Sequence, residues 1–294
     1  MTSRAVIRES FDPKIVKGSD VFLDREFPMS GSNYKLISGL AYKESGIVLN
    51  DTKQEMVYSR LARRIRDLKL KDFDEYLHYV KRDIDNEFRS FLNAITTNLT
   101  SFFREDHHFV HLKEVTIPLL RKIHLNDKRV RVWCTAASTG EEPYSIAMVM
   151  REAFAENSGW DIKILATDID SNVLETARAG RYKLERIEGI PQARKKRWFK
   201  KISDDSVEVS DSLKDLISFK QLNLLKPWPM KGVFDIVFCR NVIIYFDKET
   251  QRTLFDKVHL KMAEDAHLYI GHSESLHNVS KKFSPLGKTI YKRK

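Results

Sequence analysis

The stretch Val132–Ser145, VWCTAASTGEEPYS, decides the fold class of this 294-residue chain. An apolar run ends in small residues, and Gly140, two glutamates and the start of a helix follow. A strand, a tight turn and a helix in this order are typical of the first unit of a doubly wound sheet, where ligands meet the carboxyl end of the strand. The phosphate-binding patterns GxGxxG and GxxxxGK[ST] do not occur here, and two glutamates would repel phosphate. The segment therefore favours a positively charged ligand, such as a sulfonium or an amine, with a plain tight turn as the alternative.

Beyond this stretch, short apolar runs alternate with helical patterns. Such alternation predicts an α/β domain with a mostly parallel sheet covered on both faces. We expect strands at 129–134, 162–167, 234–239, 267–270 and 289–291, and helices at 143–156, 171–179 and 247–263. Two alternating runs between residues 194 and 222 predict a small antiparallel β-subdomain inserted into this domain.

The N-terminal part has a different pattern. Val57, Leu61, Ile65 and Leu68 recur at helical spacing, and similar stripes continue to residue 99. The sequence therefore predicts a flexible tail at 1–28, a small helical bundle at 29–100 and the α/β domain at 101–294.

Composition narrows the class of protein. The chain has 51 Lys and Arg against 41 Asp and Glu, a net charge of +10, 42% hydrophobic residues and two cysteines. These values exclude a mainly disordered chain and a disulfide scaffold. Neither a membrane span nor a secretory signal is visible, so we expect a cytoplasmic protein with two buried, reduced cysteines.

Polar residues follow the second and third predicted strands. Asp168 stands where a carboxylate hydrogen-bonds ribose hydroxyls in nucleotide-binding folds, and Asp170 suits the cap of the next helix. A pair of caps without ligand contact is the alternative. Arg240 and Asn241 follow the third strand without the proline motif typical of enzymes that methylate nucleic-acid amines.

Taken together, the motifs of the chain resemble those of the chemotaxis receptor methyltransferases, the CheR family. The resemblance covers residues 34–291, and the order and spacing of the motifs make it specific. The motifs are TTNLTSFFRE (96–105), VWCTAASTGEEPYS (132–145), ATDID (166–170), NLL (223–225), FCRNVIIYFD (238–247) and GHSES (271–275).

The resemblance implies a helical domain followed by a Rossmann-like methyltransferase domain. It also implies methyl transfer from S-adenosylmethionine to receptor glutamates, giving S-adenosylhomocysteine and a glutamate methyl ester on the cytoplasmic part of methyl-accepting chemoreceptors. By motif, the implied cofactor contacts are Asn98, Thr100, Arg104, Glu142, Asp168, Asn223, Leu224, Arg240 and Asn241. Arg104 and Tyr245 match positions that line the methyl-transfer site.

The residue types suit this chemistry. A glutamate with a pKa of about 4.3 is already ionised near neutral pH, so the reaction needs no general base. The fork of Arg104 would hold the acceptor carboxylate, and the phenol of Tyr245 would orient it. The alternative for Arg104 is an ion pair with Glu105 or Asp106. The competing classes are a non-catalytic module that retains the cofactor fold and a nucleic-acid methyltransferase, which the basic charge alone favours.

Two further features concern partners and metals. Arg60, Arg63, Arg64 and Arg66 crowd one helix, and we expect the first three to dock on an acidic receptor surface, with a solvated face as the alternative. The subdomain loop KKISDDS lacks the glycines of family members that bind a receptor tether, so we expect no tether requirement. We also expect a monomer, no nucleic-acid partner and no membrane insertion. His107, His108 and His111 include a pair at i, i+4 spacing that could bind a metal, but no third ligand accompanies the pair in the sequence pattern, so we expect no metal.

Overall fold

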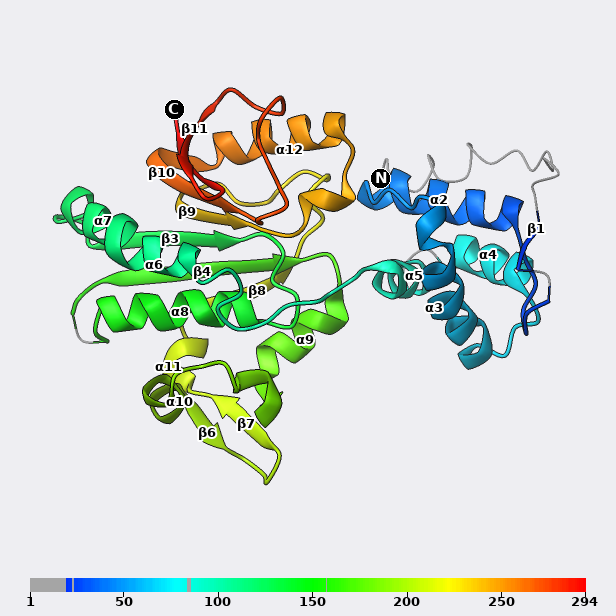
Figure 1. The fold of residues 1–294 in the computed structure, drawn as a ribbon, viewed down its shortest axis with the longest axis horizontal. Helices are drawn as coiled ribbons and strands as arrows, with labels where there is room; N and C mark the ends of the chain where they lie inside the picture. The colour runs from blue at the N-terminus through cyan, green and yellow to red at the C-terminus, as the bar shows by residue number, and fades with distance from the viewer. Residues whose placement is uncertain (1–19, 23, 84–85, 157) are drawn as a thin grey trace. The chain divides into compact units, whose positions relative to one another are not determined.

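The computed structural model describes residues 20–22, 24–83, 86–156 and 158–294. The chain divides into two compact units, coloured from blue to cyan and from cyan to red in Figure 1. The first comprises Met1–Glu44 and Leu49–Ile95, and the second comprises Ser45–Val48 and Thr96–Lys294. Within the stretch predicted as a tail, residues 1–19 lie outside the described residues. Asp20–Phe22 form strand β1, which pairs antiparallel with β2 (Met29–Ser30).

Helices make up most of the first unit, as the sequence predicts. The apolar stripe forms one face of a helix, and Val57, Leu61 and Ile65 are fully buried. Asp72 caps the next helix by accepting the backbone N–H of Glu75 at 2.8 Å, which satisfies one of the donors left free in the first turn. The helices are α2 (Gly31–Ser45), the short turn η1 (Asp51–Lys53), α3 (Gln54–Asp67), α4 (Phe73–Arg82) and α5 (Glu87–Ile95).

The second unit is built on a seven-stranded sheet in the order β11-β12-β10-β9-β3-β4-β8. The five strands from β10 to β8 run parallel, and β12 and β11 continue the sheet antiparallel beside β10. The strands are β3 (Arg129–Cys134), β4 (Asp161–Asp168), β8 (Ile217–Gln221), β9 (Phe234–Cys239), β10 (Met262–Ile270), β11 (Phe283–Gly287) and β12 (Ile290–Arg293). The mostly parallel α/β sheet predicted from the sequence is confirmed.

Helices cover both faces of this sheet (Figure 1). Alternate residues of a strand point to opposite faces, so Val132 and Ile236 join the core beneath α8, whereas Trp133 and Val237 join the core beneath α12. The helices of this unit are α6 (His107–His111), the π-helical turn η2 (Leu112–Thr116), α7 (Ile117–Ile123), α8 (Glu141–Ala153), α9 (Ser171–Ala179), η3 (Leu184–Ile187), α10 (Gln192–Trp198), α11 (Asp211–Lys214), η4 (Ile243–Tyr245) and α12 (Lys248–Leu260).

The inserted subdomain has different limits from those that the sequence predicts. A small antiparallel sheet exists, but its strands are β5 (Arg181–Lys183), β6 (Phe199–Lys201) and β7 (Ser206–Val209), in the order β5-β7-β6. Residues 217–221, which we expected in this subdomain, form β8 at the edge of the main sheet, parallel to β4. The alternation of apolar residues predicts a strand here, but not the sheet that the strand joins.

The parallel strands bring their carboxyl ends to one edge of the sheet. Cys134, the last residue of β3, is in register with Ala166 of β4 and with Phe238 of β9. The segments that follow these three strands therefore meet at this edge, where open α/β sheets bind their ligands.

Candidate functional site

The glycine turn after β3 is required by the packing of the protein itself. Gly140 has φ +102°, in the left-handed region that a side chain disfavours, and it stands at the start of α8. A Cβ atom there would lie 2.7 Å from the hydroxyl of Tyr182 and 2.9 Å from Cβ of Ala177. The predicted turn is thus confirmed, and its glycine has a structural reason that is independent of any ligand.

Both glutamates after this turn already have an arginine partner. Glu141, which is 1% exposed, pairs with Arg186, and Glu142 accepts from Nη1 of Arg240 at 2.5 Å. Burial raises the pKa of Glu142, and the neighbouring charge of Arg240 opposes that rise. The negative charge that we read from the sequence as favouring a cationic ligand is therefore largely balanced within the protein. Oε1 of Glu142 has a weak thiol donor, Cys134, at 3.2 Å, and a carboxylate oxygen can accept a second, stronger donor.

Asp168 ends β4 with a buried carboxylate. Its oxygens accept the backbone N–H groups of Ser138 at 2.8 Å and Asp170 at 3.0 Å. Burial raises the pKa of Asp168 to about 6, although these hydrogen bonds act in the opposite direction. Asp170 caps α9 through the N–H of Asn172, as predicted, and also accepts from the side chain of Asn98 at 2.8 Å. Asn98 is thereby fixed beside the end of β4.

Arg240 is the centre of the site and its side chain is fully buried. Besides Glu142, its Nη2 lies 3.3 Å from Oε2 of Glu105 and donates to the carbonyl oxygen of Arg104 at 2.5 Å. Its Nε has no hydrogen-bond partner among the described residues. A buried donor of this kind offers a hydrogen bond to a ligand at the same edge of the sheet.

Asn241 follows with φ +55° and is held by Glu274. The carboxylate of Glu274 accepts the backbone N–H groups of Asn241, Val242 and Ile243, each at 2.9 Å. A Cβ at Gly271 would approach the Asn241 side chain to 2.5 Å, so this glycine allows the two segments to pack together.

The other residues predicted from the sequence make the following contacts. Arg104 is about one-third exposed, and its Nη1 donates to the carbonyl oxygen of Leu99 at 2.9 Å. Its Nε lies 4.0 Å from Glu105, so the alternative ion pair exists only at the limit of contact. The carbonyl oxygen of Thr100 accepts from Arg186, and Tyr245 lies half-buried in η4. Asn223 accepts the backbone N–H of Leu225, and Leu224 is buried in the core beneath α12.

Two family profiles and several known proteins match this chain. Residues 32–96 match the family profile "CheR methyltransferase, all-alpha domain", and residues 98–292 match "CheR methyltransferase, SAM binding domain". The chain is 41% identical to the chemotaxis protein methyltransferase of Salmonella typhimurium, covering 92% of each chain. It is 40% identical to chemotaxis protein methyltransferase 2 of Pseudomonas aeruginosa, covering 93% of this chain and 97% of that one.

The chain belongs to the CheR methyltransferase family. Its cofactor is S-adenosylmethionine, and the donor set at the sheet edge fits that molecule. The buried carboxylate of Asp168 can accept from hydroxyl groups, Glu142 retains capacity to accept from an ammonium group, and Arg240 has a free buried donor.

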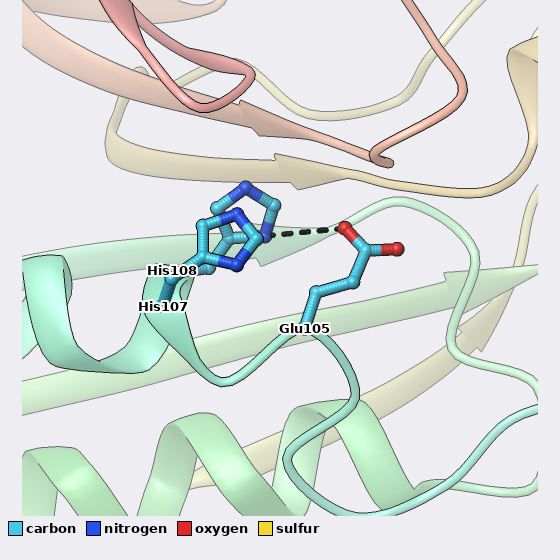
Figure 2. A group of neighbouring side chains, drawn as sticks. All are labelled: Glu105, His107 and His108. Carbon is cyan, nitrogen blue, oxygen red and sulfur yellow. Dashed lines mark ion pairs between the residues drawn. The ribbon is translucent and has the colours of Figure 1, made fainter.

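In this CheR-family chain, Glu105, His107 and His108 form a group whose ligand atoms lie within 4.8 Å of one another (Figure 2). Oε2 of Glu105 lies 3.6 Å from Nδ1 of His108, the ion pair drawn in Figure 2. The guanidinium of Arg240 contacts the same oxygen, and a cation bound there would be repelled by it. Burial and the charge of Arg240 lower the pKa of His108 to about 3. The imidazole of His108 is therefore neutral, and it is the charge of Arg240 on the same carboxylate that leads us to interpret the group as a network of polar contacts around Glu105 rather than a metal centre.

The predicted docking arginines lie in the helical unit of the CheR fold and differ in their contacts. Arg64 binds the buried carboxylate of Glu87 with two hydrogen bonds, at 2.5 and 3.2 Å, and Arg60 donates to the carbonyl oxygen of Ala94. Arg63 is exposed. Arg64 therefore has a structural partner that the sequence did not indicate, because Glu87 lies on another helix.

Sequence reasoning missed three residues of the CheR site: Glu105, His272 and Glu274. The GHSES motif contributes to the family resemblance, but the resemblance implies no role for its side chains. Their partners lie between 31 and 167 residues away in the sequence, so no local spacing could reveal them.

Proposed function

We propose that this protein transfers the methyl group of S-adenosylmethionine to glutamate side chains on the cytoplasmic part of chemoreceptors. The observation that carries the proposal is the position of Arg104. Its side chain is partly exposed, while its backbone is tied to Arg240 at the edge that holds Asp168 and Glu142. A guanidinium placed there is suited to bind a carboxylate with two parallel hydrogen bonds.

S-adenosylmethionine supplies a methyl group on a positively charged sulfur. In the proposed reaction, a carboxylate oxygen of the acceptor forms a bond to the methyl carbon as the carbon–sulfur bond breaks, giving a methyl ester and S-adenosylhomocysteine. Arg104 would orient the acceptor, and Tyr245 would orient it from the other segment of the site. Orientation of this kind supplies roughly 7–11 kcal/mol in favourable cases. No proton has to be removed, which agrees with a site that needs no general base.

Asp168 would accept hydrogen bonds from the ribose hydroxyls, and Glu142 from the ammonium group. Asn98, Thr100, Arg104, Asn223, Leu224, Arg240 and Asn241 would complete the cofactor contacts. This assignment follows the family motifs, and the burial of Asp168 and Arg240 at one sheet edge supports it.

The deciding experiment is the transfer of labelled methyl groups to receptor-enriched membranes, with the modified peptides mapped. We expect base-labile methyl esters on receptor glutamates. A protein that binds S-adenosylmethionine but labels no receptor would favour the non-catalytic alternative, and label in added RNA or DNA would favour the nucleic-acid alternative.

We predict that Asp168→Ala weakens cofactor binding by roughly 1.5–3 kcal/mol, because a hydrogen bond to a charged group is lost. Asp168→Asn is the matched control, since it keeps the shape of the side chain beside the N–H groups of Ser138 and Asp170. Calorimetry measures both affinities, and an unchanged value for the alanine variant would contradict the assignment.

The same residue predicts a pH dependence. Since the pKa of Asp168 is raised from 3.8 to about 6, the carboxylate gains a proton as the pH falls through 6 and becomes a weaker acceptor. Cofactor affinity should therefore decline between pH 7 and pH 5 in the natural protein. The Asp168→Asn variant, which has no carboxylate at this position, should lose that decline, and an identical pH profile for both would refute the prediction.

The receptor would dock on the arginine-rich face of α3, without a requirement for a C-terminal tether. Among the described residues, none of the helices is long and apolar enough to cross a membrane. The short β6–β7 connection lacks glycine, which favours direct action on the receptor helices over recruitment through a tether, and we propose that the protein acts as a monomer.

This docking proposal predicts that Arg60→Ala with Arg63→Ala raises the receptor KM by roughly 2- to 30-fold, because each surface charge pair contributes about 0.2–1 kcal/mol and two pairs are lost. The salt dependence of KM should flatten as well, since rim charges act through screened attraction. Arg64 is kept intact because it pairs with the buried Glu87. The matched control is Arg82→Ala, an exposed arginine at the end of α4. If the double variant leaves the receptor KM unchanged and deletion of the receptor's C-terminal tail strongly lowers methylation, the protein uses the tether instead.

A further inference from the structure

Arg104 lies between two residues with unusual backbone conformations. Phe103 has φ +53° and Glu105 has φ +58°, both in the left-handed region that costs a residue with a side chain about 1 kcal/mol or more. Such a conformation persists only where surrounding contacts fix it. The contacts on this segment therefore determine where the guanidinium of Arg104 is presented.

The carboxylate of Glu105 supplies most of those contacts. Its Oε1 accepts from Nδ1 of His272 at 2.9 Å and from the side chain of Asn241 at 3.3 Å. Its Oε2 accepts the backbone N–H of His272 at 3.0 Å and lies 3.3 Å from Arg240. Burial alone would raise the pKa of Glu105, but the hydrogen bond from His272 and the charge of Arg240 outweigh it and lower the pKa to about 2. The group is thus a permanent anion in the working range of pH.

Two side chains of the GHSES segment bind the two segments that carry Arg104 and Arg240. His272 binds Glu105, which belongs to the segment of Arg104, and Glu274 binds the backbone after Arg240, which leads into η4 and Tyr245. Glu274 also accepts the N–H of Gly271 at 2.6 Å, a hydrogen bond within the GHSES segment itself. This arrangement joins three parts of the chain, 104–105, 240–243 and 271–274, in one hydrogen-bonded network.

We propose that Glu105 is a positioning residue for Arg104, held in place by His272 of the GHSES segment. Glu105 faces no substrate in this role. It fixes the strained backbone on either side of Arg104, and Arg240 binds the carbonyl oxygen of Arg104 itself. The inference rests on the proposed role of Arg104 in methyl transfer and adds the residues that orient it.

The test is a double-mutant cycle of Glu105→Gln with Arg104→Ala, read as turnover on receptor membranes. If Glu105 acts through Arg104, Glu105→Gln should lower turnover at least tenfold in the natural protein, with the receptor KM changed by less than threefold. In the Arg104→Ala background, the same change should cost less than twofold. Equal losses in both backgrounds would overturn the proposal, because a residue with a merely structural role acts independently of Arg104.

Three further variants sharpen the cycle. His272→Ala should lower turnover in the same direction, and His272→Asn should restore most of it, because the asparagine amide can donate from near the position of Nδ1. Asp106→Asn removes an exposed carboxylate next to Glu105 and should leave turnover within twofold. Failure of His272→Asn to improve on His272→Ala would contradict the role of the Nδ1 donor.

A separate readout distinguishes failure of this inference from failure of the proposed function. The same four proteins of the cycle are titrated with S-adenosylmethionine by calorimetry, which needs no methyl acceptor. Natural protein that binds the cofactor but methylates no receptor would refute the proposed function alone. In that case, the calorimetric cycle decides the positioning role. The role is upheld if the effect of Glu105→Gln on cofactor affinity differs by more than twofold between the natural and the Arg104→Ala backgrounds. It is refuted if the effect is the same in both.

Discussion

Arg240→Met is expected to destabilise the protein by about 3–5 kcal/mol, because it leaves buried carboxylates without their compensating charge. Arg240 is fully buried and binds Glu142 at 2.5 Å, and it also contacts Glu105 at 3.3 Å. Once the guanidinium is removed, two acids face each other in a site from which water is largely excluded. Denaturant titration measures the loss of free energy of unfolding directly.

Two controls separate this effect from a general loss of packing. Lys282→Met removes a cation whose partner, Asp256, is 55% exposed, and should cost no more than about 1 kcal/mol. Glu142→Gln added to Arg240→Met should recover part of the stability, because it neutralises one of the stranded charges. If the free energy of unfolding of Arg240→Met lies within about 1 kcal/mol of that of the natural protein, the buried charge network contributes little to stability.

Arg104→Ala is expected to lower methyl transfer roughly 100-fold, because two charge-assisted hydrogen bonds to the acceptor carboxylate are lost. At the lower end of their range, about 1.5 kcal/mol each, the two bonds together account for a loss of this size. Stability should change little. The carbonyl oxygen of Leu99, which Arg104 contacts at 2.9 Å, belongs to a residue that is 76% exposed, so water can replace the lost donor.

Arg104→Lys is the informative companion variant. It keeps the charge but loses the planar fork, so we expect an intermediate turnover. Tyr245→Phe should change cofactor affinity much less than Arg104→Ala changes turnover, since the phenol only orients the acceptor. Initial rates with receptor membranes and calorimetry with S-adenosylmethionine check both statements. Natural turnover in Arg104→Ala would leave this arginine only its structural contacts with the carbonyl oxygen of Leu99 and with Glu105.

The sequence determined those features that depend on residues close together in the chain. The stripe of Val57, Leu61 and Ile65 predicts a helix with one buried face, and the order of apolar runs predicts the parallel strands. The cap at Asp170 and the turn at Gly140 likewise follow from the local requirements of a helix start and a left-handed backbone. The helical stripe, the cap and the turn depend on backbone and side-chain contacts that span only a few residues, so the sequence pattern contains them.

Only the tertiary structure decided which distant groups meet. It places residues 217–221 in the main sheet rather than the subdomain, and it gives Arg64 a partner in Glu87. It also joins Glu105 to His272, although 167 residues separate them. Burial then gives these contacts their chemical consequence, since removal from water raises the pKa of Asp168, while the partners of Glu105 lower its pKa. A sequence pattern contains neither the partner nor the burial, because both arise only when segments far apart in the chain pack together.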